Sequence, residues 1–135
     1  MKKELVHEHI EKNMEPNDTL IGFFYAISPP KLALFFLIGP LAGLCMRIYF
    51  LAVTEKGLYF HKLNMIGKFK ECDFFEFNEI EKVKIGKGFL QRPLNFYFKN
   101  KRKIKLKAQL KGSNKVALIT PEIQSYIESK VTLVQ

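Results

Sequence analysis

The sequence has little of the residue types that build catalytic and metal sites: it contains two cysteines, three histidines and no tryptophan among 135 residues. Cys45 lies in an apolar run and Cys72 in a mixed, strand-like stretch, so no disulfide framework is expected and both thiols are expected to be reduced. His7 and His9 fall on different sides of an expected helix, and His61 stands alone in an expected strand. We therefore predict no catalytic residues, no metal site and no cofactor, and we expect the protein not to be an enzyme.

Acidic residues are also scarce. Lysine and arginine number 22 against 13 aspartate and glutamate, which gives a formal charge of +9. This excess favours anionic partners such as phosphate groups, a membrane surface or nucleic acid. The charge is uneven as well, because five acids lie near the start of the chain (Glu4, Glu8, Glu11, Glu15 and Asp18) while no acid occurs between Lys99 and Lys115. We expect a polarised molecule.

No uninterrupted apolar run is long enough to cross a membrane. The longest, Leu32 to Met46, falls short of the about 20 residues that a spanning helix needs, and Gly39-Pro40 interrupts it. Two interpretations stay open: a hydrophobic insertion covered by protein, or contact with one leaflet of a membrane. The start of the chain is charged and does not resemble a secretory leader. The expected location is therefore cytoplasmic, either free or peripheral at the inner face of the cell membrane. The residues expected to make the hydrophobic contact are Leu34, Phe35, Phe36, Leu37, Ile38, Leu41 and Leu44.

The remaining pattern is mainly that of β-strands. Thirteen phenylalanines and five tyrosines supply all the aromatics, and short alternating runs recur at regular intervals. The adjacent pair Phe74-Phe75 disturbs the alternation and predicts a β-bulge. Two helices are expected outside the strands, one over Lys2 to Met14 and one after the N-cap Thr120. The expected strands are Thr19 to Ile27, Arg47 to Thr54, Leu58 to Leu63, Lys68 to Phe77, Ile80 to Gly86, Leu94 to Lys99 and Lys103 to Ala108.

One expected strand carries lysine at every outward position. In Lys103 to Ala108 the three lysines share one face and the apolar residues share the other. A solvated strand whose lysines prevent aggregation is one interpretation, and an anion-binding surface is the other. Anionic lipid ranks above nucleic acid as the partner, because each basic residue near an anionic leaflet contributes about 1 kcal/mol and no aromatic residue for base stacking lies between Lys99 and Lys115. The predicted anion- or lipid-binding residues are Lys99, Lys101, Arg102, Lys103, Lys105 and Lys107.

Three segments resemble the bacterial pleckstrin-homology-like (PH-like) domain family. The hairpin Tyr49 to Phe60 is similar to the family's y-x-LT-x-x-x-L signature, and Phe77 to Val83 is similar to its y-x-x-I-x-x-V step. Leu94 to Phe98 then precedes a lysine-rich strand and a terminal helix. The resemblance implies a barrel of two roughly orthogonal antiparallel sheets, about seven strands in all, closed by a C-terminal helix. No phosphoinositide-binding motif of the eukaryotic relatives can be matched residue by residue.

These observations divide the chain into an N-terminal amphipathic helix at 1–16 and a PH-like domain at 17–135, with the hydrophobic insertion at 31–46. The predicted function is a non-enzymatic module for binding or oligomerisation. Its expected partner is an anionic membrane surface or another protein, including a second copy of the chain. A small basic β-barrel that binds nucleic acid is the alternative, and no small-molecule substrate is identified.

Overall fold

The described residues form seven antiparallel strands flanked by two α-helices of ten residues each. The computed structural model of the chain describes residues 3–29, 37–39, 46–64, 66–110 and 118–133. The mainly β fold predicted from the sequence is confirmed, with a short helix at the start and another at the end. The elements are α1 (Lys3–Lys12), β1 (Leu20–Ser28), β2 (Arg47–Thr54), β3 (Gly57–Leu63), β4 (Phe69–Glu76), the 3-10 helix η2 (Phe77–Glu79), β5 (Ile80–Ile85), β6 (Gln91–Phe98), β7 (Lys103–Gln109) and α3 (Pro121–Lys130).

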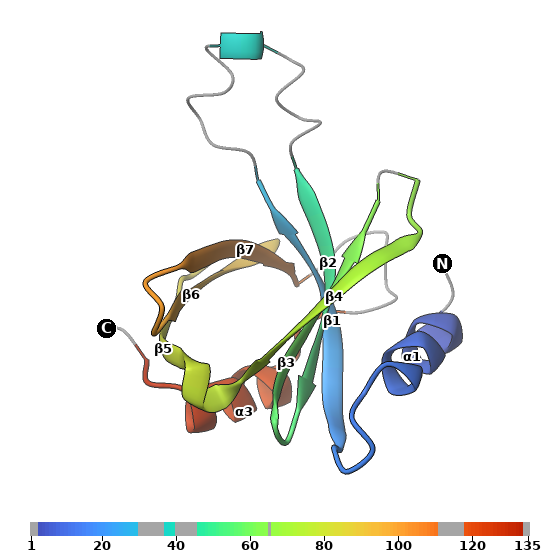
Figure 1. Ribbon diagram of the computed structural model, residues 1–135. Coiled ribbons are helices and arrows are strands. Elements are labelled where there is room, and N and C mark those ends of the chain that lie inside the picture. The colour runs from blue at the N-terminus through green and yellow to red at the C-terminus, as the bar shows by residue number, and fades with distance from the viewer. Residues whose placement is uncertain (1–2, 30–36, 40–45, 65, 111–117, 134–135) are drawn as a thin grey trace.

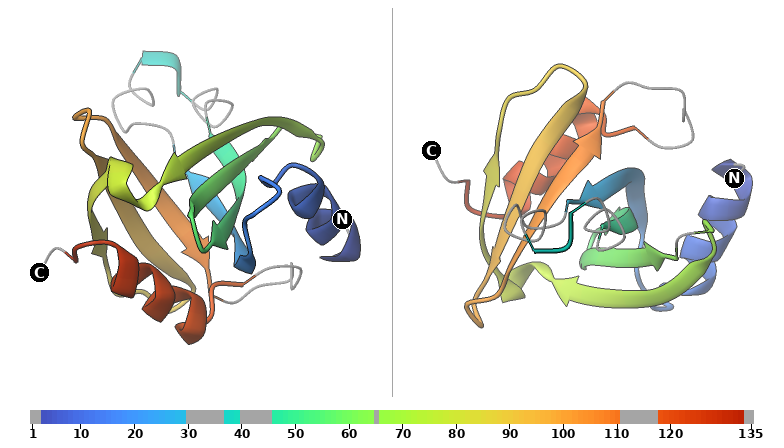
Figure 2. Two further views of the ribbon diagram at one scale, coloured as in Figure 1. Left: turned by 60° about the horizontal axis from the view of Figure 1, so that its bottom comes forward. Right: turned by 90° about the horizontal axis from the view of Figure 1, so that it is seen from above.

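The strands form one bent sheet in the order β4-β3-β2-β1-β7-β6-β5. β1 pairs with all of β2 but meets β7 only at Ala26 and Ile27, so two residue pairs join the halves. The sheet bends there, and β5 to β7 lie across from β1 to β4 (Figure 1, Figure 2). We expected a barrel of two roughly orthogonal antiparallel sheets, closed by a C-terminal helix. The structure has a single sheet instead, and it is not closed, because the edge strands β4 and β5 do not pair with each other.

The main core fills the space inside the bend. Phe24 and Phe60 from one half meet Phe96 and Leu106 from the other, and all four side chains are almost completely buried. Phe60 contacts Phe96 edge to face, with ring centroids 6.1 Å apart. Because apolar and polar residues alternate along these strands, every second side chain points into the core that the two halves share.

α3 closes one end of this core. Thr120 caps the helix, since its Oγ1 accepts a hydrogen bond from the backbone N of Ile123 at 3.2 Å, and Pro121 occupies the first turn. Ile123 and Ile127 belong to the main core cluster. The helix and the N-cap Thr120 expected from the sequence are confirmed.

α1 covers a second, smaller cluster on the outer face of β2 and β3. Val6 and Ile10 of α1 are fully buried there against Phe50 and its neighbours. This packing explains Phe74-Phe75, where the expected bulge is wrong. The register is regular at these two residues, and the irregularity lies between Lys62 and Leu63 instead. Apolar residues occupy both positions because both faces of the strand are packed. Phe75 packs against the main core, and Phe74 packs against the cluster under α1.

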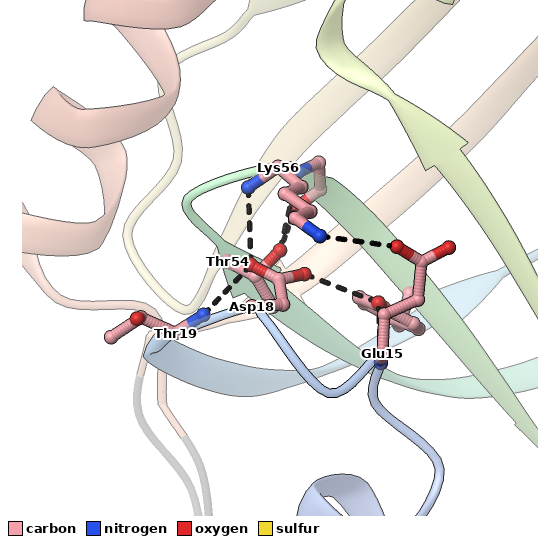
Figure 3. Close-up of polar contacts among 7 residues, drawn as sticks. Glu15, Asp18, Thr19, Thr54 and Lys56 are labelled. Carbon is pink, nitrogen blue, oxygen red and sulfur yellow. Dashed lines mark hydrogen bonds and ion pairs between the residues drawn. The ribbon is translucent and has the colours of Figure 1, made fainter.

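A polar network fastens the segment between α1 and β1 to the β2–β3 hairpin (Figure 3). Asp18 Oδ1 accepts hydrogen bonds from the backbone N of Thr19 at 2.8 Å and of Lys56 at 3.2 Å. Its Oδ2 accepts from the Tyr59 hydroxyl at 3.1 Å, and Lys56 Nζ lies 3.4 Å from Glu15 Oε2. The network fixes where α1 joins the sheet, and thus which face the helix covers.

Candidate functional site

Five lysines stand on the outer face of the β5-β6-β7 half. The strand register places them in rows across β6: Tyr97 pairs with both Lys82 and Lys103, and Asn95 pairs with both Lys84 and Lys105. Inward-facing neighbours such as Phe96 and Leu106 are buried, which directs the lysines to the other side of the sheet. We call this surface the lysine face; it consists of Lys82, Lys84, Lys103, Lys105 and Lys107.

The lysine face has one acidic neighbour in β5, Glu81, which lies at the bulge next to Lys82. The β6 residues between the lysines are Pro93, Asn95 and Tyr97, none of which carries a charge. Among the described residues, no lysine of this face lies within 4.0 Å of a carboxylate oxygen. Like charges in such rows repel one another unless anions are near. The face is therefore suited to holding several anionic groups at once.

Two of these lysines were not among the residues predicted to bind anions. Lys82 and Lys84 alternate with Val83 and Ile85, so the sequence alone places them on the outward side of a strand. They are distant from Lys103 along the chain, so the sequence does not indicate that β5 and β7 lie on either side of β6. Lys103, Lys105 and Lys107 are exposed as predicted.

The β6–β7 turn adds three cations at one end of the lysine face. The turn is closed by the backbone N of Lys101, which donates to Phe98 O at 3.0 Å, and by Phe98 N, which donates to Arg102 O at 2.8 Å. Lys101 has a φ of 70°, a left-handed conformation that few side-chain-bearing residues adopt. Lys99, Lys101 and Arg102 are all exposed, so the six predicted anion-binding residues do share one region.

The apolar insertion is described only in part. Leu37 and Ile38 lie in a short helical turn beyond the ends of β1 and β2, with 78% and 43% of their surface exposed (Figure 1). Among the described residues, no helix has the length and hydrophobicity needed to span a bilayer. The other predicted contact residues lie outside the described ranges: Leu34, Phe35, Phe36, Leu41 and Leu44.

A groove of about 990 Å³ separates α1 from the first half of β1 and the start of α3. Its rim includes several carboxylates, but most of them have partners inside the molecule: Glu11 lies 3.0 Å from His7, and Glu15 and Asp18 belong to the network of Figure 3. α1 lies on the opposite side of the molecule from β6 and β7 (Figure 1). The acids of α1 and of the segment after it therefore lie on the side of the molecule away from β6 and β7.

A histidine and a cysteine meet beneath α1. His61 Nε2 lies 3.8 Å from Cys72 Sγ, and the His61 ring centroid lies 5.4 Å from that of His9. Burial, and to a lesser extent the nearby His9, lowers the pKa of His61 to about 4, while burial and then Asp73 raise the pKa of the Cys72 thiol to about 11. Such a thiol stays protonated at neutral pH and is a poor nucleophile. Within the described ranges, no three metal-ligating side chains gather.

Comparisons with known proteins identify the fold alone. No protein-family model matches the chain, and no curated protein sequence matches it. One similar solved structure is the hSac2 domain from human phosphoinositide phosphatase Sac2, with a TM-score of 0.57 and 14% sequence identity. The match covers 94% of this chain and 77% of that one. The two proteins therefore share a fold, with a mainly β architecture and a C-terminal helix.

Proposed function

We propose that the protein is a non-catalytic module that binds anionic membrane surfaces. The lysine face carries the proposal, because it and the β6–β7 turn place eight cations on one region, and within the described residues no lysine of this face forms an ion pair. Each basic residue close to an anionic leaflet contributes about 1 kcal/mol. Several such residues acting together therefore favour attachment of the lysine face to an anionic surface.

The apolar insertion supplies the second half of the proposed attachment. Leu37 and Ile38 expose their side chains beyond the sheet rather than packing against it. An exposed apolar segment near a cationic face fits a bilayer interface, where the charges meet the headgroups and the apolar side chains enter the acyl region. The proposed cellular location is accordingly the cytoplasmic face of the membrane.

We assign the chain to the bacterial PH-like domains as part of the same proposal. The hairpin of β2 and β3 carries the signature-like segment Tyr49 to Phe60, and α3 caps one end of the bent sheet. The bent sheet with its capping helix supports a barrel-like PH architecture for this chain. Binding, rather than catalysis, is the activity this assignment favours.

Flotation with lipid vesicles tests the proposal. The purified chain is mixed with vesicles of phosphatidylcholine alone or with phosphatidylserine, at low and at high salt. We expect flotation with the anionic vesicles and a marked loss at high salt, since screening weakens charge attraction. Flotation that is equal with both lipids would contradict a role for the lysine face.

Charge-matched variants show which surface is responsible. Lys103→Gln/Lys105→Gln/Lys107→Gln removes three charges from the lysine face. Lys12→Gln/Lys68→Gln/Lys70→Gln removes three exposed charges from α1, β4 and the residue before β4. We expect the first variant to lose most binding to anionic vesicles and the second to keep it. Equal losses would mean that net charge alone drives binding.

Self-association is the competing outcome for the apolar insertion. A chain that does not float on any vesicle and that scatters light with twice the monomer mass would assign Leu37 and Ile38 to a protein interface. Because the chain has no tryptophan, Leu37→Trp introduces a single reporter. Its emission should shift to shorter wavelength only on addition of anionic vesicles if the segment enters lipid.

Nucleic acid is the second candidate ligand, and Tyr97 is the observation that favours it. This aromatic side chain lies between Lys82 and Lys103 in the lysine face, where it could stack on a base. Binding to a single-stranded oligonucleotide should then weaken steeply with salt and depend on Tyr97.

A further inference from the structure

The loop between β5 and β6, residues 86–90, exposes two apolar side chains. Phe89 has 75% of its surface exposed and Leu90 has 58%, although most other large apolar side chains of the described strands are buried. Neither residue was expected to have a role from the sequence. Lys87 in the same loop is exposed too, so the loop combines a cation with apolar side chains.

The loop lies at the end of the lysine face opposite the β6–β7 turn. Lys107 pairs with Pro93, and the next outward pair along the same two strands is Gln91 with Gln109. The backbone N of Leu110 then donates to Leu90 O at 3.0 Å, which attaches the loop to the end of β7. Figure 2 shows the loop and the β6–β7 turn at the two ends of β6. The lysine face thus has cations at one end and apolar side chains at the other.

The base of the loop is held in place by the protein. Gly86 N donates to Pro93 O at 2.9 Å, and Arg92 Nη1 donates to Gly86 O at 3.4 Å. A Cβ atom at Gly88 would collide with the carbonyl oxygen of Gln91, so the loop folds back closely on the start of β6. The exposure of Phe89 and Leu90 therefore follows from a defined backbone. Contiguous exposed apolar surface with a polar rim is a feature of interaction sites, and Phe89 and Leu90 are adjacent in the chain.

We propose that Phe89 and Leu90 enter the lipid of an anionic bilayer while the lysine face binds its headgroups. This inference rests on the proposed membrane function and adds a second point of insertion to Leu37 and Ile38. Apolar side chains of interfacial proteins enter the boundary between headgroups and acyl chains by about 5–10 Å. A second apolar contact gives the lysine face a fixed orientation on the membrane, which charge attraction alone does not.

A single tryptophan in the loop reports directly on insertion. Phe89→Trp puts one indole into a chain that has none, and Leu5→Trp puts one on the exposed side of α1 as a control. With vesicles of phosphatidylcholine and phosphatidylserine, we expect a blue shift for Phe89→Trp and quenching by lipids brominated in the acyl chain. Leu5→Trp should show neither effect. An unchanged Phe89→Trp emission on vesicles that bind the protein would overturn the inference.

Truncation of the same side chains measures their contribution. Leu90→Ala and its control Leu5→Ala each shorten a leucine side chain to a methyl group. The two leucines are similarly exposed, with 58% of the surface of Leu90 and 56% of that of Leu5 accessible. Because burial of one such side chain accounts for roughly a tenfold change in partition, we expect Phe89→Ala/Leu90→Ala to lower vesicle partition by about tenfold or more. Leu5→Ala should change it by less than about twofold. Thermal unfolding of each variant confirms that the fold is retained.

The salt dependence separates the two proposals. If the loop inserts, the residual binding of the wild-type chain at high salt should disappear in Phe89→Ala/Leu90→Ala, while the low-salt binding is only reduced. If the variant and the wild type show the same vesicle partition at every salt concentration, the loop has no role in attachment and this inference is wrong. If the wild type does not bind anionic vesicles at all, the proposed function and this inference are both wrong.

Discussion

Lys82 Nζ lies 5.3 Å from the centroid of the Tyr97 ring on the outer face of the sheet. The ammonium group is held over the aromatic face by a cation–π contact, which is worth about 0.5–1 kcal/mol at an exposed site. One face of Tyr97 is thus covered by a lysine of the same domain. This arrangement spaces the cations of neighbouring strands and leaves the ring a poorer platform for stacking a base.

Replacement of Tyr97 distinguishes lipid from nucleic acid as the ligand. We expect Tyr97→Leu to change partition onto anionic vesicles by less than about twofold, because the lysines supply the attraction. A stacked base contributes about 1–3 kcal/mol, so a nucleic-acid-binding role requires Tyr97→Leu to weaken oligonucleotide binding by at least about fivefold. Titration of a fluorescent single-stranded oligonucleotide and vesicle flotation, both at the same salt concentration, make the comparison.

The stability of the fold should fall on acidification because of His61. Its pKa is lowered to about 4 in the folded chain, chiefly by burial, against an ordinary value of 6.5, and the pKa of His9 is lowered as well. The unfolded chain therefore binds the proton more readily, and the free energy of unfolding decreases as the pH falls from 6.5 to about 4. For His61 the loss is at most about 3 kcal/mol.

Urea unfolding at a series of pH values measures this effect. His61→Gln should flatten the pH dependence over that interval, whatever it does to stability at neutral pH. His7→Gln is the matched control, because His7 lies on the exposed side of α1 and pairs with Glu11. If the slope is the same in the wild type and in His61→Gln, burial of this imidazole does not determine the acid sensitivity.

Two glycines should respond differently to alanine. At Gly57 a Cβ atom would collide with the backbone oxygen of Phe75 on the neighbouring strand, which cannot move without breaking the β3–β4 pairing. At Gly22 the nearest atoms belong to the flexible side chain of Ile123, at 2.9 Å. We expect Gly57→Ala to cost about 3 kcal/mol or more and Gly22→Ala about 1 kcal/mol in free energy of unfolding. Equal costs in a denaturant titration would contradict this assignment.

Asp18 should contribute more to stability than an exposed aspartate. Its carboxylate accepts hydrogen bonds from two backbone N–H groups and from the Tyr59 hydroxyl. Asp18→Ala leaves these donors without their acceptor, and we expect a loss of about 1–3 kcal/mol. Asp73→Ala, at an exposed position in the edge strand β4, should cost less than about 0.5 kcal/mol. Chemical denaturation compares the pair, and a smaller loss for Asp18 than for Asp73 would refute the network's role.

Alternation along single strands was sufficient to predict most of the fold. Lys103 to Gln109 alternates cleanly because only one of its faces is packed, and the helix after Thr120 has a cap, a proline in its first turn and an apolar stripe. Phe74-Phe75 misled the prediction for the opposite reason. α1 packs over the outer face there, and a strand covered on both faces no longer alternates.

The candidate site was predictable only within one strand and its turn. Lys103, Lys105 and Lys107 are two residues apart, so their common face follows from strand geometry. Lys82 and Lys84 belong to the same face only because β6 pairs with β5 on one side and with β7 on the other. This pairing cannot be predicted from the residue pattern of a single strand. In the sequence, Phe89 and Leu90 are two apolar residues before a strand, with no sign that they are exposed. Their exposure depends on the tight turn at Gly88, where the chain folds back on Gln91.

The narrow contact between β1 and β7 has a consequence for how the chain folds. β1 to β4 pair in sequence order and so do β5 to β7, so each group can assemble from contacts that are local in the chain. Only Ala26 and Ile27 pair across the long interval to β7. Closing that interval costs loop entropy before the contacts of the shared core compensate for it. We therefore expect the docking of β1–β4 onto β5–β7 to be the slow step of folding.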